Sequence, residues 1–353
     1  GTPPQIGANA NMYIDDFEGS ETPYDLTRQP IKWILGSPPK EFYDEATVRS
    51  NPLSYTYKRA KLSWYNVDQT AFYQNSAQKP GNITDDEISN HYVRSIGPQE
   101  IYPQRSLQAG VANETTLDLA YFPEERGMYN FNPNLTSEGK LTNPKNNFAS
   151  LTRSISFDTD FDNANIQYIE FWLMDPFISG AKGNLRLDNG NTIIDNSLNQ
   201  GGELWFQLGS VSEDLMKDGK HAFENGLPPD GSRTGIDENN WGYVTKTTYV
   251  NNAFSNLGGA RDNQDVGLDG LKTSEELTFS GYQNFVNAVN SRVTNPAKRD
   301  QILADISNDD FKYYLSVDSK NILDRYSHHN GMENNSGTNT VNGFIQSNTN
   351  LPD

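Results

Sequence analysis

The sequence predicts a mainly β protein with a helical appendage, an α+β chain in which residues 1–212 form a jelly-roll-like β-sandwich. Up to about Gln207, short apolar alternations are separated by clusters of Gly, Pro, Asn and Asp, which is typical of strands joined by turns. After Leu208 the apolar spacing changes to that of short helices. We therefore expect one sandwich followed by a smaller helical region.

Eight segments fit short strands, because apolar and polar residues alternate in them and turn formers flank them. They cover residues 12–18, 31–35, 60–67, 115–122, 151–157, 167–175, 184–188 and 203–208. The segment 167–175 has apolar side chains on both faces, which predicts a central strand that is buried on both sides. We also expect Trp64, Trp172 and Trp205, which lie within strand patterns, to face the core.

Residues 213–327 are predicted to be a linker plus a helical appendage with an acidic loop. A short helix is expected at 214–223, a linker rich in Gly, Pro, Asp and Asn at 228–240, and a longer helix at 275–293. Asn295 predicts the cap of a second helix with Pro296 in its first turn, and a third helix is expected around Ile322. Residues 328–353 contain few apolar residues, which predicts a disordered tail.

The acidic loop DVGLDGLKTSEE, residues 265–276, has most of the spacing of an EF-hand calcium loop. Such loops place oxygen ligands at positions 1, 3, 5, 7, 9 and 12, with a glycine at position 6. The residues that match this pattern are Asp265, Asp269, Gly270, the Leu271 carbonyl, Thr273 and Glu276. Position 3 is Gly267, which has no side-chain oxygen, so a water or a nearby carboxylate such as Asp262 would have to replace it. We expect calcium or a similar hard cation here; the alternative is a metal-free acidic turn whose carboxylates cap a helix.

Two weaker candidate sites lie elsewhere. Asp15, Asp16 and Glu18 belong to YIDDFEGS, which resembles the first strand of galactose-binding-like jelly rolls and so implies a structural calcium at a strand edge. The alternative is that these residues are edge charges that discourage pairing between sheets. Trp241 lies in a polar linker and is the candidate for an exposed aromatic that stacks on sugars.

The composition argues against several classes of protein. With 46 acidic and 28 basic residues the net charge is −18, which would repel nucleic acid and anionic lipid. The sequence has no cysteine, and it has no apolar run long enough to insert directly into a membrane. It has four histidines and lacks a nucleophile elbow, a phosphate-binding loop or a paired-histidine metal motif. We therefore expect a water-soluble piece that is not an enzyme.

Long motifs carry a resemblance to a known family. They are YIDDFEGS at 13–20, YFPEERGMYNFNPN followed by NIQYIEFWLMDPF within 121–177, and LGSVSEDLMKDGKHAFENGLP at 208–228. These segments resemble the SprA/Sov family of very large outer-membrane translocon subunits of type IX secretion and gliding motility. We interpret the chain as an excised fragment of such a protein. Within the motif PEERGMYN, we expect Arg126 and Gly127 to form a structural clasp.

The resemblance implies a non-enzymatic, water-exposed domain of the translocon at the cell outer membrane, on the periplasmic or the extracellular side. Such a domain would brace or line the export path, with other subunits of the secretion machinery and exported cargo proteins as its partners. The alternative is a cell-surface carbohydrate-binding module that uses exposed aromatics and a bound calcium.

Overall fold

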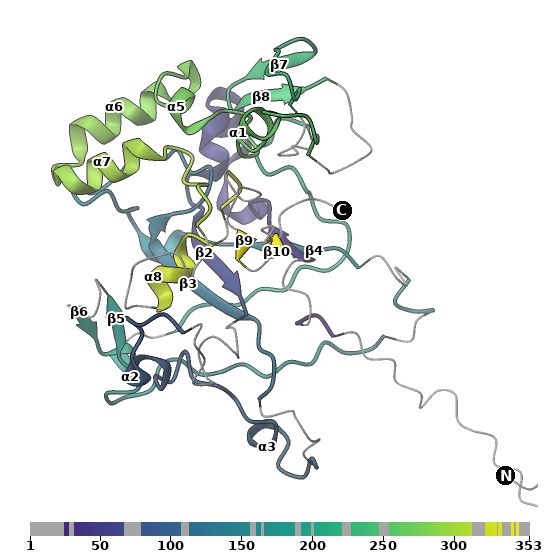
Figure 1. Cartoon of the computed structure of the whole chain (residues 1–353), viewed down its shortest axis with the longest axis vertical. Helices are drawn as coiled ribbons and strands as arrows, with labels where there is room; N and C mark the ends of the chain where they lie inside the picture. Colours follow the sequence, from purple (N-terminus) through teal and green to yellow (C-terminus); the bar gives the residue numbers. More distant parts are fainter. Residues whose placement is uncertain are drawn as a thin grey trace, which may run out of the picture.

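The computed structural model describes residues 25–27, 32–66, 79–106, 113–155, 160–163, 166–187, 192–198, 201–220, 227–246, 254–312, 322–329, 331–333, 340–341 and 344–345. In these residues the fold is a mixed α+β arrangement of short helices and short antiparallel strand pairs (Figure 1). The predicted α+β content is therefore confirmed.

Each sheet in the described part of the chain has two strands. The pairs are β1 (Trp33–Leu35) with β4 (Leu151–Arg153), β2 (Ala60–Tyr65) with β3 (Asp118–Arg126), β5 (Leu185–Leu187) with β6 (Thr192–Ile194), β7 (Ile236–Asn239) with β8 (Gly242–Thr245), and β9 (Thr340–Val341) with β10 (Phe344–Ile345). The longest pair, β2 with β3, crosses the middle of Figure 1. Trp64 of β2 is buried as predicted, and its indole N–H donates to the carbonyl of Trp33 at 2.9 Å.

The helices are short. They are α1 (Glu45–Ser50), α2 (Asp85–Ile88), α3 (Pro98–Ile101), α4 (Arg261–Gln264), α5 (Thr273–Glu276), α6 (Gln283–Arg292), α7 (Pro296–Ala304) and α8 (Ile322–Ser327), with 3-10 turns at Lys40–Phe42, Pro52–Thr56, Pro144–Asn146, Asn196–Leu198 and Ser280–Tyr282. The side chain of Asn295 accepts the N–H of Lys298, so the predicted start of α7 is confirmed. No helix in the described ranges is long and apolar enough to cross a membrane.

One main core joins the strands to the helices. Phe131, which follows β3, stacks on Tyr282 with ring centroids 4.0 Å apart and meets the edge of Phe285 at 6.0 Å. Trp64 of β2 and Val289 of α6 belong to the same buried cluster. Residues on both sides of the predicted boundary at 212 therefore contribute to a single core.

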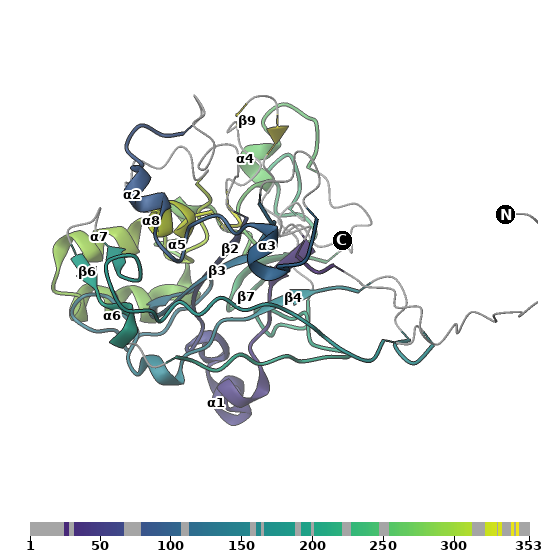
Figure 2. The same cartoon turned by 90° about the horizontal axis from the view of Figure 1, so that it is seen from below.

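The described residues do not confirm the predicted jelly-roll sandwich. A sandwich needs two sheets packed face to face, but the predicted strands 167–175 and 203–208 belong to no ladder in the part of the chain that the structure describes. Both are extended, and Figure 2 shows the teal segments beyond β4 leaving the body as long arms. The predicted strand 12–18 lies outside the described residues.

Two predicted helices differ from the structure. Residues 215–219 form bends instead of a helix, and 221–226 lie outside the described residues. The predicted helix 275–293 is broken into α5, a 3-10 turn and α6, because Phe279 takes an extended backbone conformation and buries its ring against Tyr282 at 4.9 Å. Tertiary packing therefore overrides the helical spacing at this point.

Residues 331–333 do not behave as the predicted disordered tail. Met332 is buried, and its N–H donates to the carbonyl of Asp309 at 2.5 Å. The N–H of Phe311 donates to the carbonyl of Glu333 at 2.8 Å. Gly331 permits this contact, because a β-carbon there would lie 2.3 Å from the carbonyl oxygen of Asp309. The prediction of disorder is therefore wrong for these three residues, because a single buried methionine and close backbone pairing outweigh the polar composition of the segment.

We expect Gly127→Ala to lower the free energy of unfolding by about 2 kcal/mol, because the added carbon has no room. A β-carbon at Gly127 would lie 2.4 Å from the carbonyl oxygen of Ala60, and the N–H of Gly127 donates to Arg59 at 3.0 Å. Chemical denaturation measures the change. At Gly81 nothing lies within 4 Å of an added β-carbon, so Gly81→Ala is the control. Equal effects of the two substitutions would contradict the steric explanation.

Candidate functional site

An exposed apolar surface lies on two extended segments, residues 166–178 and 201–213, which we call the apolar arms. Trp172 is 70% exposed, Leu173 73% and Trp205 67%. The arms touch where the rings of Phe171 and Phe206 have centroids 5.2 Å apart. The large apolar residues exposed on the arms are Tyr168, Ile169, Phe171, Trp172, Leu173, Met174, Phe177, Leu204, Trp205, Phe206, Leu208 and Val211.

The prediction that Trp172 and Trp205 face the core is therefore wrong. The alternation correctly puts apolar side chains on both faces of 167–175, but no described strand pairs with this segment and no described layer buries it. A strand with two apolar faces needs cover on both sides. The arms thus have the amino-acid composition of a buried strand, although their apolar side chains are exposed.

Polar contacts hold the end of the first arm against the body. His91 Nε2 lies 2.8 Å from the carbonyl oxygen of Asp175, and the Asn196 side chain donates to the carbonyl of Pro176 at 2.5 Å. The backbone N–H of His91 also donates to the carbonyl of Lys182 at 2.8 Å. These contacts position the arm while its apolar side chains stay exposed.

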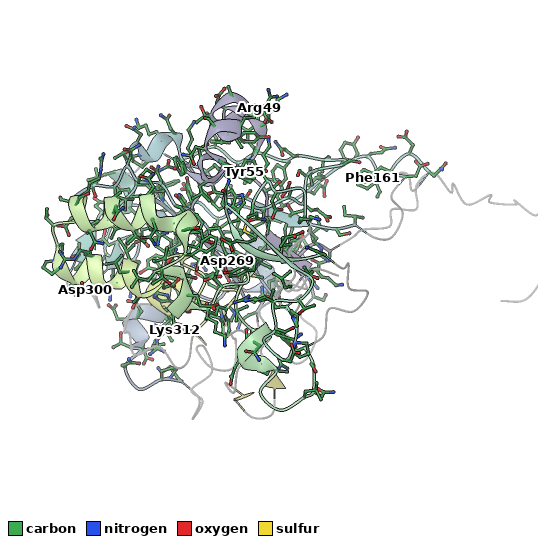
Figure 3. All side chains as sticks on the ribbon, turned by 90° about the horizontal axis from the view of Figure 1, so that it is seen from above. Arg49, Tyr55, Phe161, Asp269, Asp300 and Lys312 are labelled. Atoms are coloured by element: carbon green, nitrogen blue, oxygen red, sulfur yellow. The ribbon has the colours of Figure 1, made fainter. Side chains whose placement is uncertain are left out.

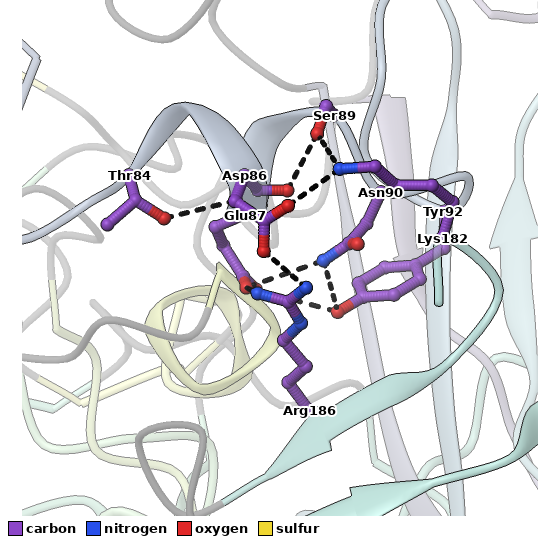
Figure 4. Close-up of polar contacts among 8 residues, drawn as sticks. All are labelled: Thr84, Asp86, Glu87, Ser89, Asn90, Tyr92, Lys182 and Arg186. Carbon is purple, nitrogen blue, oxygen red and sulfur yellow. Dashed lines mark hydrogen bonds and ion pairs between the residues drawn. The ribbon is translucent and has the colours of Figure 1, made fainter. Parts of the chain in front are cut away.

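A charged clamp on α2 fixes the hairpin that follows this arm (Figure 4). Asp86 accepts a hydrogen bond from Lys182 at 2.7 Å and forms an ion pair with Arg186 at 2.5 Å. Arg186 also lies 3.6 Å from Glu87, a side chain whose pKa is raised by burial. Thr84 caps α2 by accepting the N–H of Glu87 at 3.2 Å. The clamp therefore joins α2 to residues almost a hundred positions further along the chain.

The acidic loop 265–276 does not assemble the predicted ligand set. Asp265 follows the single turn of α4, whereas Asp269 lies in the middle of the body (Figure 3), where it accepts the N–H of Leu271 at 2.9 Å. The hydroxyl of Thr273 donates to Asp310 at 3.4 Å. In the described ranges, the acids close enough to share a metal ion include only one loop residue, Glu276.

The carboxylates that do meet come from three distant segments. Glu276 of α5, Asp309 after α7 and Glu333 each offer an oxygen, and these oxygens all lie within 4.8 Å of one another. All three side chains are buried, and Asp269 is buried beside them. We call Asp269, Glu276, Asp309 and Glu333 the buried acid cluster.

Gly267 explains how Asp309 reaches the loop. Gly267 has φ +75°, and a β-carbon at this position would lie 2.1 Å from Asp309 Oδ2. The loop position that lacks a side-chain oxygen is therefore the position against which the carboxylate of Asp309 rests. Tyr129 donates its hydroxyl proton to the same Asp309 oxygen at 2.7 Å. Asp262, the substitute named from the sequence, is exposed on α4.

Burial dominates the electrostatics of the buried acid cluster. It raises the pKa of Glu276 and of Glu333 to about 8, with repulsion from Asp305 adding to the effect at Glu276 and repulsion from Asp309 at Glu333. Burial likewise raises the pKa of Asp269 and of Asp309 well above the usual range, and repulsion from Glu276 adds to both. The protein interior thus opposes four negative charges at this place unless something positive accompanies them.

The remaining sequence candidates fall elsewhere. Asp15, Asp16 and Glu18 lie outside the described residues. Trp241 is 2% exposed, so its predicted role as an exposed platform is wrong. It lies in the turn between β7 and β8 and packs on the ring of Phe131 at 6.1 Å, which a polar sequence context did not reveal.

Sequence reasoning missed Asp309 and Glu333. Asp309 belongs to the run DISNDD at 305–310, which has three acids but no ligand spacing, and Glu333 lies in the segment predicted to be disordered. The acidic run after a helix was the only signal available for Asp309, and no signal pointed to Glu333.

Comparisons with known proteins do not assign this chain to a family. No protein-family model matches it, and a search of curated proteins finds no match.

Proposed function

We propose that this chain is a water-facing, non-enzymatic domain of a type IX secretion translocon at the cell outer membrane, where it braces the protein-export path. Its apolar arms pair with β-structure of neighbouring subunits of the secretion machinery. The motifs at 13–20, 121–177 and 208–228, which resemble the SprA/Sov family, support the translocon as the setting. The exposed apolar arms support strand pairing as the way in which the chain contacts neighbouring subunits.

The single observation that carries the proposal is the two-sided apolar exposure of residues 167–174. A small ligand covers one patch, but an extended segment with two apolar faces that pairs with no described strand is completed by another strand and by the layers around it. The contacts of His91 and Asn196 hold the end of the arm in place, which lowers the entropic cost of pairing. In this setting the predicted jelly-roll sandwich would be completed by strands from the partner.

A role as a carbohydrate-binding module is supported less well. Trp241, the aromatic expected to stack on sugars, is buried. The exposed Trp172 and Trp205 alternate with aliphatic side chains such as Leu173 and Leu204, which offer a sugar hydroxyl no hydrogen-bond partner. The net charge of −18 also makes nucleic acid a poor partner.

Photo-crosslinking in the intact translocon tests the pairing. A photoreactive residue at position 172 or 205 is expected to crosslink to other secretion subunits, because these side chains are exposed and apolar. The same residue at Asp300, which is exposed on α7 and labelled in Figure 3, is the matched control and is expected to give little product. Mass spectrometry of the products identifies the partners.

Trp172→Ser combined with Leu173→Ser is the companion variant. Secretion should fall, while the stability of the isolated chain should change by no more than about 0.5 kcal/mol, since both side chains are exposed. Equal crosslinking from positions 172 and 300, or full secretion by the double variant, would refute the pairing. Retention on a glycan affinity gel that is lost in Trp172→Ala would favour the carbohydrate-binding role.

A further inference from the structure

The buried acid cluster is independent of the apolar arms and has no part in the proposed pairing. It joins three pieces of chain: α5 through Glu276, the loop after α7 through Asp309, and residues 331–333 through Glu333. Three backbone hydrogen bonds hold the third piece in place. The N–H groups of Met332 and Glu333 donate to the carbonyl of Asp309, and the N–H of Phe311 donates to the carbonyl of Glu333. The carboxylates therefore meet where a distant segment docks on the body.

Nothing positive in the described residues pairs with these acids. None of the ion pairs involves Glu276, Asp309 or Glu333. Arg126 is near enough to Glu276 to interact electrostatically, but its guanidinium donates to the carbonyls of Asn130 and Ile306. A buried carboxylate without a cation is strongly unfavourable.

One carboxylate oxygen of the cluster has no hydrogen-bond donor among the residues that the structure describes. Glu333 is 6% exposed, and its Oε2 is buried without a hydrogen-bond donor among the described residues. Its other oxygen accepts a long bond, 3.3 Å, from the backbone N–H of Thr273, and the Thr273 side chain also contacts this carboxylate. Since buried polar atoms are nearly always satisfied, an unpartnered oxygen that belongs to a group of three converging carboxylates indicates a missing positive ligand.

The surrounding donors are arranged for ionised carboxylates. Glu276 accepts the backbone N–H groups of Ile306 at 2.8 Å and Ser307 at 3.0 Å. The Ser307 hydroxyl lies within hydrogen-bond distance of both Glu276 and Asp309, although it has a single proton to donate. The two backbone N–H groups stabilise the ionised form of Glu276, which favours a cation over a protonated acid at that carboxylate.

We propose that Glu276, Asp309 and Glu333 bind one hard divalent cation, of which calcium is the best fit, and that this ion latches residues 331–333 onto the body. Calcium binds oxygens at about 2.3–2.6 Å, so two of its ligands can lie up to about 5 Å apart, whereas magnesium ligands lie at most about 4.2 Å apart. The three oxygens all lie within 4.8 Å of one another, a spread that one calcium ion can bridge. This site shares Glu276 with the loop predicted from the sequence but takes its other ligands from outside that loop.

Calcium titration of the chelator-treated full chain tests the site. Isothermal titration is expected to show one calcium per chain. Terbium should give luminescence on tyrosine excitation, because the hydroxyl of Tyr129 lies 2.7 Å from an oxygen of Asp309. Glu333→Gln and Asp309→Asn should each weaken binding about tenfold or more, because each removes one ligand charge. Asp300→Asn, the same change on the exposed face of α7, should leave the affinity unchanged.

Hydrogen exchange in the same protein tests whether the ion holds residues 331–333 on the body. Removing calcium is expected to speed hydrogen exchange at the amides of Met332 and Phe311, which form two of the docking bonds, and to leave the amide of Leu62 in β2 unaffected. Glu333→Gln should show fast exchange at both amides with or without calcium. A chain that gives neither heat nor terbium signal, or variants that bind as tightly as Asp300→Asn, would overturn the proposal.

Discussion

Phe131→Ala is expected to lower the free energy of unfolding by about 3–5 kcal/mol, the usual cost of emptying a buried aromatic site. Phe131 is 1% exposed and lies at the centre of a group of rings, stacked on Tyr282 and at the edge of Phe285. Its neighbours come from α6, from the 3-10 turn before it and from the turn at Trp241, so they cannot collapse together into the space. Urea denaturation followed by circular dichroism measures the loss.

Phe171→Ala is the matched control, because it removes the same atoms from a side chain that is 54% exposed on the apolar arm. We expect it to change the free energy of unfolding by no more than about 0.5 kcal/mol. Similar losses of stability from the two substitutions would mean that the arm is packed in solution. The interpretation of the arm as an exposed surface would then be wrong. The pair of variants therefore separates the core from the proposed interface.

Local patterns in the sequence identify short elements well. Alternation locates β2 and β3, and the Asn295–Pro296 pair gives the start of α7. The same patterns cannot specify what covers an element. Trp172 and Trp241 show this limit: the first alternates in a strand pattern yet is exposed, and the second lies in a polar stretch yet is buried. The burial of a side chain depends on which distant segment packs against it, and a single sequence does not show which segments make contact.

The candidate metal centre shows the same limit at the level of chemistry. The calcium-loop spacing in the sequence identifies Glu276 as a ligand, and it identifies Gly267 as the position without a side-chain oxygen. The carboxylate of Asp309 lies against Gly267. Glu333 comes from a segment whose composition predicts disorder. Ligands gathered from three segments have no spacing to detect, so only the fold reveals them.

Arg126→Met is expected to lower the free energy of unfolding by about 3–5 kcal/mol, because it removes a buried cation and the hydrogen bonds that it donates to two buried carbonyls. The guanidinium donates to the carbonyls of Asn130 at 2.6 Å and Ile306 at 2.8 Å, and it lies over the ring of Phe285 at 4.6 Å. It thereby ties β3 to the loop after α7, which is the clasp that the sequence predicts. Burial lowers its pKa to about 10, so it stays charged at neutral pH.

Arg126→Lys separates charge from geometry. Lysine keeps the positive charge but cannot present the planar fork that reaches both carbonyls, so about half of the loss should remain. Arg49→Met on the exposed face of α1 is the control and should cost no more than about 0.5 kcal/mol. Full stability in Arg126→Lys would show that charge alone matters. Full stability in Arg126→Met would show that β3 and the loop after α7 are held together by apolar packing, with the clasp contributing nothing.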